Sequence, residues 1–211
     1  MARCDGVITA ELFILDSLEL RGHEEKCSSA FAPVYVRGGS SFLTHLSSGL
    51  LLRYALGVTC DEQLATTDYG KPYLVGGGPP FFNLSNDGRT VVLAVATDVI
   101  GVDVQAIGLS DETVMRRHFP VEAYREFSSA PPEDRPLVFA RYWTSLESRL
   151  KALGTGLSAD YRNHPELFDG LFTHHFQVDD IMIACTMRQD FESSFRRLRL
   201  ADIQKRLEMA C

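Results

Sequence analysis

The sequence has 211 residues, of which 45% are hydrophobic and 23% charged, and its formal net charge is −7 at pH 7. This composition is typical of a soluble globular protein, and the negative charge argues against a surface that wraps nucleic acid. The five cysteines are scattered without a C-x-x-C pair, which favours a reducing cytoplasm over disulfides or structural zinc. The sequence shows no signal-peptide core and no apolar run of membrane-spanning length, so we expect a cytoplasmic protein without a membrane partner.

In chain order, the pattern predicts a helix over residues 41–56, a loop over 70–80 and a hairpin over 91–107 that turns at Thr97-Asp98. Further on it predicts helices over 111–127 and around 142–156, a hairpin turning at Asp179-Asp180 and a final amphipathic helix over 191–209. We therefore expect an α+β fold of two similar halves, residues 1–105 and 106–211, each with a small antiparallel sheet packed on helices. Two similar halves in one chain predict a monomer with a pseudo-twofold axis.

The stretch YWTSLESRLKALGTG (residues 142–156) predicts a helix with one large apolar stripe that faces a core. Glu147 and Lys151 lie one turn apart just off that stripe, and the glycines at 154 and 156 are suited to end the helix. Two interpretations remain open at this point. The pair is either a solvated i,i+4 ion pair, as most such pairs are, or half of an active site that faces a cleft.

The run IGVDVQA predicts a strand in which Asp103 and Gln105 share one face with Gly101. Gly101 has no side chain, so we expect room there for a ligand to approach the sheet. The ordinary interpretation of Asp103 is an exposed turn or capping residue. The functional interpretation is a Mg²⁺ site, which needs one or two carboxylates and the phosphates of a substrate. A single carboxylate is not sufficient for that site.

Residues 81–105 (FFNLSNDGRTVVLAVATDVIGVDVQ) and 142–158 (YWTSLESRLKALGTGLS) together resemble the Sfp-type 4′-phosphopantetheinyl transferases, with YGKPYL at the expected place upstream. The resemblance implies an enzyme that transfers the 4′-phosphopantetheine group from coenzyme A to a serine of an acyl or peptidyl carrier protein, releasing 3′,5′-ADP. It implies one Mg²⁺ held by Asp103 and Glu147 against the pyrophosphate of coenzyme A. Lys151 would then stabilise charge on the leaving phosphate, and Glu147 would accept the proton of the carrier serine.

The resemblance also implies a set of residues that contact coenzyme A along its adenine end and its phosphates. For Lys71 and Pro72, a plain surface turn remains the alternative. For Arg53, contact with coenzyme A and a core-helix position with the charged end reaching solvent are equally open. The residues assigned to coenzyme A are Tyr69, Gly70, Lys71, Pro72, Ser85, Asn86 and Arg53.

Three departures from the family pattern leave a second function open. Asn86 stands where the family usually has histidine, and Leu146 stands where it has lysine. Gln105 stands where many members have a second acid, and we expect its neutral oxygen as a third ligand of the metal, one that water could replace. A degenerate relative that binds coenzyme A or a carrier protein without turning it over is therefore the alternative to an active transferase. For the carrier protein, which is typically acidic, the resemblance implies a docking surface at the basic MRRHF segment (residues 115–119).

Overall fold

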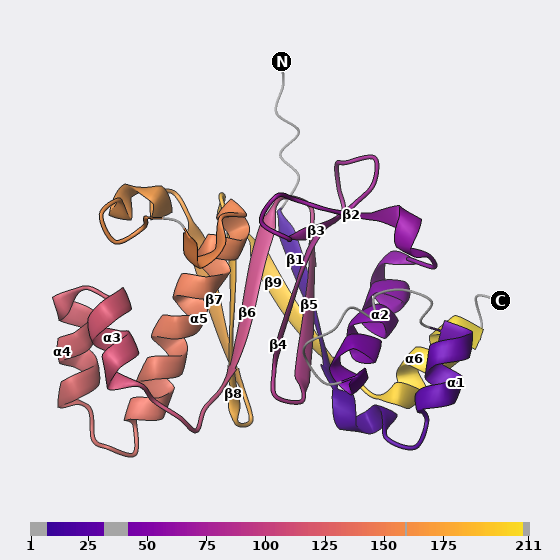
Figure 1. Ribbon diagram of the computed structural model, residues 1–211, viewed down its shortest axis with the longest axis horizontal. Helices are drawn as coiled ribbons and strands as arrows, with labels where there is room; N and C mark the ends of the chain where they lie inside the picture. The colour runs from indigo at the N-terminus through magenta and orange to yellow at the C-terminus, as the bar shows by residue number, and fades with distance from the viewer. Residues whose placement is uncertain (1–7, 32–41, 159, 209–211) are drawn as a thin grey trace.

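The computed structural model describes residues 8–31, 42–158 and 160–208, and it places two sheets in the middle of the molecule with helices on their outer sides (Figure 1). The first sheet has the order β4-β5-β1-β9, the second has the order β6-β8-β7, and β2 and β3 form a small separate pair. The first sheet comprises β1 (Thr9–Asp16), β4 (Phe81–Asp87), β5 (Thr90–Ala96) and β9 (Glu192–Leu198). The second comprises β6 (Ile100–Ala106), β7 (Phe172–Val178) and β8 (Ile181–Met187), and the small pair comprises β2 (Leu64–Thr66) and β3 (Pro72–Leu74).

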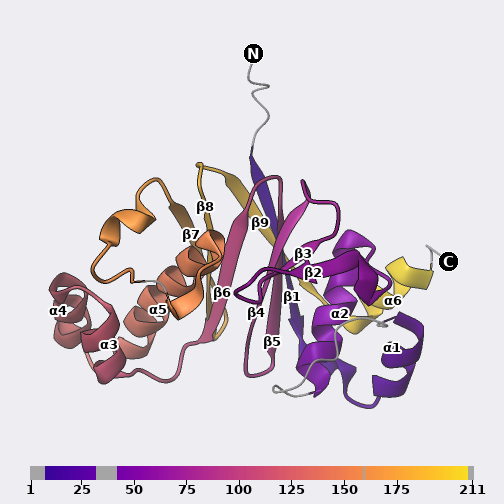
Figure 2. The ribbon, with the colours of Figure 1, turned by 45° about the horizontal axis from the view of Figure 1, so that its top comes forward.

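Each sheet has its own helices, as the second view also shows (Figure 2). The first sheet is accompanied by α1 (Glu24–Phe31), α2 (Phe42–Leu56) and α6 (Leu200–Glu208), and the second by α3 (Glu112–His118), α4 (Val121–Ser129) and α5 (Arg135–Leu153). Short 3₁₀ turns complete the described chain at Ser17–Leu20, Asp61–Gln63, Gly156–Ser158 and Pro165–Phe168. The mixture of helices and small sheets confirms the expected α+β class. The expectation of an antiparallel sheet in each half is wrong for the first sheet, because β9 pairs in parallel with β1.

The sheets share a core because their strands are apolar on more than one face. Leu12 and Val92 of the first sheet pack with Val102 and Ile183 of the second, and all four are fully buried. The opposite face of the first sheet packs against α2, where the fully buried Leu50 is one of the largest side chains. Burying such side chains contributes roughly 1.5–3 kcal/mol each, so the strands between two helical layers hold the molecule together.

Three predicted elements differ in the structure. The loop predicted over 70–80 contains the short strand β3, which pairs with β2. The hairpin predicted around Thr97-Asp98 is wrong, because β5 and β6 lie in different sheets and Thr97-Asp98 connects them. Instead, β5 pairs with β4 across Gly88, which has φ +55°, and Asp-Gly is a strong turn sequence between strands. The predicted helix over 191–209 is also wrong in its first part. Residues 192–198 form β9, which pairs in parallel with β1, and only 200–208 are helical.

Other predicted elements are confirmed, some with shifted ends. The hairpin of β7 and β8 turns at Asp179, which has φ 51°. The helix predicted over 111–127 is two helices, since Pro120 lacks an N–H and restricts the residue before it. The division into halves near residue 105 stays a prediction. Strand β6 of the predicted first half lies in the second sheet, and β9 and α6 of the predicted second half pack against β1 and α2.

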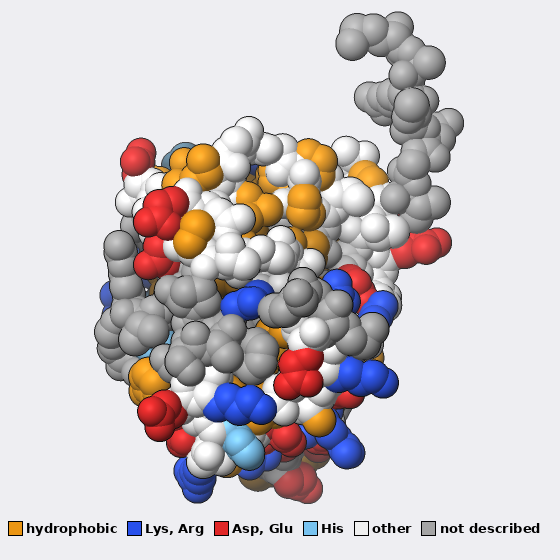
Figure 3. All heavy atoms as spheres, turned by 90° about the vertical axis from the view of Figure 1, so that its right-hand side faces the viewer, with side chains coloured by type: hydrophobic (Ala, Val, Ile, Leu, Met, Phe, Trp, Pro, Cys, Tyr) orange, Lys and Arg blue, Asp and Glu red, His pale blue; other side chains and the backbone are white. Residues whose placement is uncertain are grey.

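The face on the α1, α2 and α6 side carries basic and acidic side chains side by side over the helices, with more apolar side chains toward β2 and β3 (Figure 3). Tyr69, Tyr73 and Val75 are among the exposed apolar residues of the chain. Within the described residues, no helix combines the length and the apolarity needed to cross a membrane.

Candidate active site

Strands β4 and β6 belong to different sheets, and polar side chains of β4 join them. Alternate residues of a strand share a face, so Asn83, Ser85 and Asp87 all face β6. The Asn83 Oδ1 accepts a hydrogen bond from the backbone N–H of Val102 at 2.8 Å. The Asp87 Oδ2 accepts another from the N–H of Ala106 at 2.5 Å. The border between β4 and β6, called the seam below, is therefore lined with polar side chains and is not closed by backbone hydrogen bonds between the two strands.

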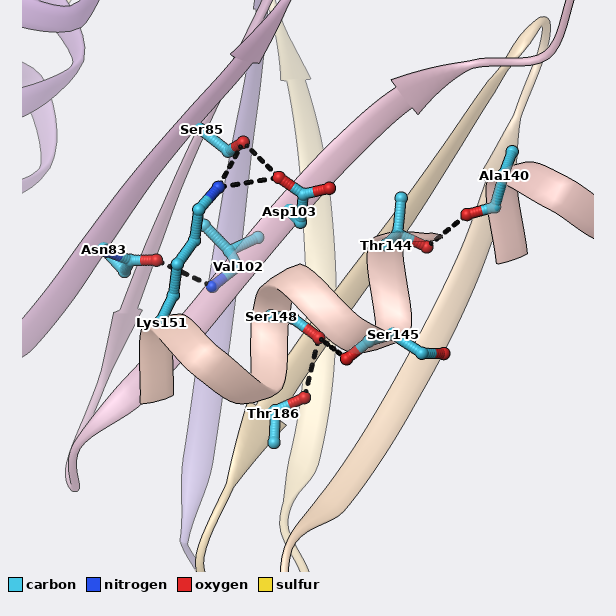
Figure 4. Close-up of polar contacts among 10 residues, drawn as sticks. All are labelled: Asn83, Ser85, Val102, Asp103, Ala140, Thr144, Ser145, Ser148, Lys151 and Thr186. Atoms are coloured by element: carbon cyan, nitrogen blue, oxygen red, sulfur yellow. Dashed lines mark hydrogen bonds and ion pairs between the residues drawn. The ribbon is translucent and has the colours of Figure 1, made fainter. Parts of the chain in front are cut away.

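Ser85, Asp103 and Lys151 meet at the middle of this seam, each from a different element (Figure 4). The Ser85 hydroxyl donates to Asp103 Oδ1 at 2.8 Å. The Lys151 ammonium donates to the same carboxylate oxygen at 2.6 Å and to the Ser85 Oγ at 2.9 Å. The Asp103 carboxylate is buried, and the Lys151 side chain is about a quarter exposed at 26%. Asp103 and Lys151 thus form a largely desolvated ion pair at the border of the two sheets.

Helix α5 reaches the site because it packs unusually close to β6. A Cβ built on Gly101 would lie 2.0 Å from the Ser148 carbonyl oxygen and 2.3 Å from the Ala152 nitrogen. The space that we expected to admit a ligand at Gly101 is therefore filled by the helix backbone, and that expectation is wrong. The helix presents small residues to the sheet for the same reason, and these are Ala140, Thr144, Ser148 and Ala152, all buried.

The large apolar stripe of α5 packs elsewhere. Phe139 packs in a small core with the residues of α3 and α4, and Leu146 and Leu150 pack with Tyr161 in another. The expectation that this stripe faces a core is correct, although that core lies away from the sheet. This arrangement turns the edge of the stripe that carries Glu147 toward the seam, because consecutive residues on a helix are about 100° apart.

Glu147 is half-buried on α5, and no hydrogen bond to its carboxylate occurs within the described part of the chain. Burial raises the pKa of Glu147, the negative charge of Asp103 raises it further, and the Lys151 ammonium opposes both effects. Burial also raises the pKa of Asp103, against the opposing influence of Lys151 and Ser85. Both carboxylates therefore lie close enough to the Lys151 ammonium to be influenced by its charge.

Lys71 and Pro72 line a cavity of about 280 Å³ beside the seam. Other residues of its wall come from the segment 73–82, from the start of β6 and from the end of α5. The Lys71 ammonium itself donates to two backbone carbonyls, those of Ile100 at 2.9 Å and Lys151 at 2.7 Å. Burial and the nearby Lys151 charge lower the pKa of Lys71 to about 8. The cavity thus lies against the same two elements that carry Asp103 and Lys151.

The remaining residues assigned to coenzyme A lie at different places. Tyr69 and Gly70 form the exposed turn between β2 and β3. Asn86 is exposed, and strand alternation directs it away from the face of β4 that carries Ser85. Arg53 is half-buried in the last turn of α2, which packs on the outer face of the first sheet. The structure brings Ser85 into the Asp103 cluster and leaves these four outside its hydrogen bonds.

Gln105 is on the same face of β6 as Asp103, as predicted. Its amide Nε2 donates to the Asp87 Oδ2 at 3.0 Å, so the orientation of the amide is fixed by β4. Sequence reasoning missed Asp87 and Asn83, although the alternation of polar residues in N-L-S-N-D was a signal that three side chains share the Ser85 face. It also missed the i,i+4 series of small residues on α5.

The donor set fits a divalent cation that is shared with a substrate. The described residues contain no group of three His, Cys, Asp or Glu side chains able to hold a metal ion by themselves. Asp103 and Glu147 supply two carboxylates from neighbouring elements. Mg²⁺ usually takes one or two carboxylates when phosphates complete its coordination shell.

Comparison with known proteins finds similarity over the segment that contains β6 and α5. A family model described as the 4′-phosphopantetheinyl transferase superfamily matches residues 99–199, which include β6, α5 and the residues Asp103, Glu147 and Lys151. A 4′-phosphopantetheinyl transferase of Bacillus subtilis is 32% identical over 91 residues, 43% of this chain and 41% of the relative. The transferase Sfp of Bacillus subtilis strain 168 is 29% identical over 98 residues, 46% of this chain and 44% of that protein.

A longer match exists to the 4′-phosphopantetheinyl transferase AcpT of Salmonella typhimurium, which is 28% identical over 161 residues, 74% of this chain and 81% of AcpT. The chain spans less than half the length of the first two relatives. The segment that the family model matches nonetheless holds both carboxylates and the lysine of the cluster. By these matches, residues 99–199 are similar to the 4′-phosphopantetheinyl transferase superfamily, and the transferase Sfp is among the relatives of the chain.

Proposed function

We propose that this protein transfers the 4′-phosphopantetheine group from coenzyme A to a serine of an acyl or peptidyl carrier protein, with Mg²⁺, and releases 3′,5′-ADP. The observation that carries the proposal is the placement of Asp103 and Glu147 on adjoining elements, with the Lys151 ammonium 2.6 Å from Asp103. Phosphoryl transfer requires mainly positioning and charge neutralisation, and this cluster offers both at one border between two sheets.

In the proposed reaction, Asp103 and Glu147 would hold a Mg²⁺ ion, which would supply charge neutralisation for the pyrophosphate of coenzyme A. Lys151 stabilises negative charge on the leaving phosphate, because its ammonium is partly exposed at the seam. Ser85 holds the Asp103 carboxylate through its 2.8 Å hydrogen bond. Glu147 accepts the proton of the carrier serine, a role that its raised pKa favours.

The first half, residues 1–105, binds the adenine side of coenzyme A in this proposal, and the second half, residues 106–211, supplies the helix with Glu147. The cavity that Lys71 and Pro72 line is the proposed adenine site, since it adjoins both the 69–74 motif and the last turn of α5. Its volume of about 280 Å³ is near the lower end of the range for small-molecule sites. The pseudo-twofold relation of the halves and a monomeric state belong to the same proposal.

A second cavity, of about 520 Å³, favours the second half as the surface that receives the carrier protein. Phe119, Tyr142 and Phe168 give it an apolar lining, and Arg149 and Arg162 give it positive charge. Arg162 also donates to the carbonyl oxygen of the neighbouring exposed Arg117 at 3.2 Å. Within the MRRHF segment, Arg116 is already paired with Glu112 at 2.7 Å. Among the described residues, no carboxylate pairs with Arg117 or Arg162, so in this proposal an acidic carrier meets positive charge there rather than at Arg116.

The alternative function is a relative that binds coenzyme A or a carrier protein without turnover, which the replacements at Asn86, Gln105 and Leu146 motivate. The two are separated by incubating the protein with coenzyme A, Mg²⁺ and a panel of apo carrier proteins, and then weighing the carriers. An active transferase adds the mass of one phosphopantetheine group to at least one carrier. Binding of coenzyme A without any mass gain across the panel would support the non-catalytic alternative.

A further inference from the structure

The Lys71 ammonium is half-buried and lies near another cation, and its two hydrogen bonds both go to backbone carbonyls. One is the carbonyl of Ile100, the first residue of β6, and the other is the carbonyl of Lys151 in the last turn of α5. No carboxylate pairs with Lys71 within the described residues. A buried cation is costly unless it is well hydrogen-bonded, so the site depends on both carbonyls.

The backbone of Lys71 is fixed on the other side by a tight turn. Its N–H donates to the Thr67 Oγ1 at 3.1 Å, and its carbonyl accepts from the Thr67 N–H at 2.9 Å. The side chain therefore runs from an anchored turn to the point where β6 and α5 converge. The two carbonyls that it joins lie three residues before Asp103 on β6 and at Lys151 itself on α5.

We propose that Lys71 is a positioning residue, whose ammonium fixes the last turn of α5 against the start of β6 and so holds Lys151 and Glu147 at Asp103. The inference rests on the proposed function for its kinetic consequence, and it assigns to the ammonium a role other than contact with coenzyme A. The carbonyl of Lys151 also accepts a hydrogen bond from the Gly154 N–H at 3.2 Å, within the end of the helix. The Lys71 ammonium donates a second hydrogen bond to this carbonyl, from a residue outside the helix.

The test compares the parent with Lys71→Met, which keeps a chain of similar length without donors, and with Lys71→Arg, which keeps a cation with several donors. Lys205→Met is the matched control, because it makes the same chemical change at an exposed lysine of α6, away from β6 and α5. Hydrogen exchange of the last turn of α5 is measured without coenzyme A or Mg²⁺. Transfer kinetics are then measured with coenzyme A, Mg²⁺ and an apo carrier.

We expect Lys71→Met to accelerate exchange in the last turn of α5 and to lower kcat roughly 10- to 100-fold, because a small misplacement of reacting groups has a large effect. Its KM for coenzyme A should change about threefold or less, and Lys71→Arg should restore most of kcat. Lys205→Met should leave both the exchange and kcat near the parent. A raised KM for coenzyme A with unchanged exchange and kcat would overturn the proposal and make Lys71 a coenzyme contact.

Two further outcomes remain decisive. If no carrier is modified by the parent, the proposed function fails, and the exchange difference still decides whether Lys71 fixes α5. If Lys71→Met does not fold, the exchange of Lys71→Arg decides. Parent-like exchange in Lys71→Arg supports a link made by any cationic donor, whereas fast exchange together with full transfer activity would contradict it.

Discussion

Glu147 is a half-buried carboxylate whose pKa is raised by burial and by the charge of Asp103. In the absence of substrate, its negative charge is therefore a cost to the folded state. Glu147→Gln removes that charge, so we expect the free energy of unfolding at pH 7 to rise by roughly 1 kcal/mol, which corresponds to a rise in Tm of about 2–4 °C. Transfer activity should be lost. Thermal unfolding without Mg²⁺ or coenzyme A measures this difference.

The sign of the pH dependence follows from the raised pKa. Between the ordinary value of 4.5 and the raised value, the folded state binds more protons at Glu147 than the unfolded state. The unfolding free energy of the parent therefore falls as the pH rises through this window. The advantage of Glu147→Gln should shrink as the pH is lowered from 7 toward 4.5, and an advantage that grew on acidification would contradict the assignment.

Gln105 faces the site, but its amide is held by Asp87 at 3.0 Å. We expect Gln105→Ala to lower transfer about tenfold or less, because water can take a ligand position that Mg²⁺ often leaves hydrated. Titration of Mg²⁺ against activity for parent and variant checks this. A loss as large as that of Asp103→Ala would make Gln105 essential and the two-carboxylate site incomplete.

At the residue scale, strand and helix periodicity predicted only the face on which Asp103, Glu147 and Lys151 each lie, and the resemblance to Sfp-type transferases implied that they belong to one site. The sequence did not predict that Ser85 would bond to Asp103, or that Asn83 and Asp87 would bridge two sheets. Those contacts depend on which strands become neighbours, and that is set by the packing of the whole chain rather than by local pattern.

At the element scale, the contact of α5 with β6 depends on Gly101. A methyl group there would lie 2.0 Å from the Ser148 carbonyl oxygen, which is backbone and cannot rotate away. We expect Gly101→Ala to displace α5, to destabilise the fold by roughly 3 kcal/mol or more, and to abolish transfer. Denaturant unfolding measures the first effect and the carrier mass assay the second.

The matched control for this substitution is Gly108→Ala, because a Cβ at Gly108 meets nothing within 4 Å. It should be near neutral in stability and in transfer. If Gly101→Ala were as harmless as Gly108→Ala, the close approach of α5 to β6 would not be a feature of the folded protein.

Elements were easier to predict than their pairing. The strands at residues 90–106 were recognised from β-branched residues, yet β5 and β6 proved to lie in different sheets. The strand β9 was mistaken for helix because its sequence ESSFRRL has no strong alternation of its own. Its conformation is set by parallel pairing with β1, a partner about 180 residues away in the sequence, which a local pattern does not encode.

At the scale of the whole molecule, the proposed carrier surface is local positive charge on a chain of net charge −7. Arg117→Glu combined with Arg162→Glu should raise the KM for an acidic carrier about tenfold or more and leave the KM for coenzyme A nearly unchanged, with a smaller effect at high salt. Steady-state kinetics in which each substrate is varied at low and high salt measure both constants.

Lys205→Glu on α6 is the control, because it makes the same kind of charge reversal on the helical group of the first sheet. It should leave the carrier KM within about twofold of the parent value. Equal changes in the two substrate constants for the Arg117 and Arg162 variant, or a matching effect of Lys205→Glu, would remove this surface from the docking site.

The central claim is that Asp103 and Glu147 build one site for transfer of phosphopantetheine. The most direct measurement is a double-mutant cycle in which the rate of carrier modification is followed by mass for the parent, Asp103→Ala, Glu147→Ala and the double variant. We predict that each single change lowers the rate by about two orders of magnitude or more, and that the double change costs little beyond either one, since both remove the same site. Losses that add in full, or single variants that retain the parent rate, would contradict a shared site.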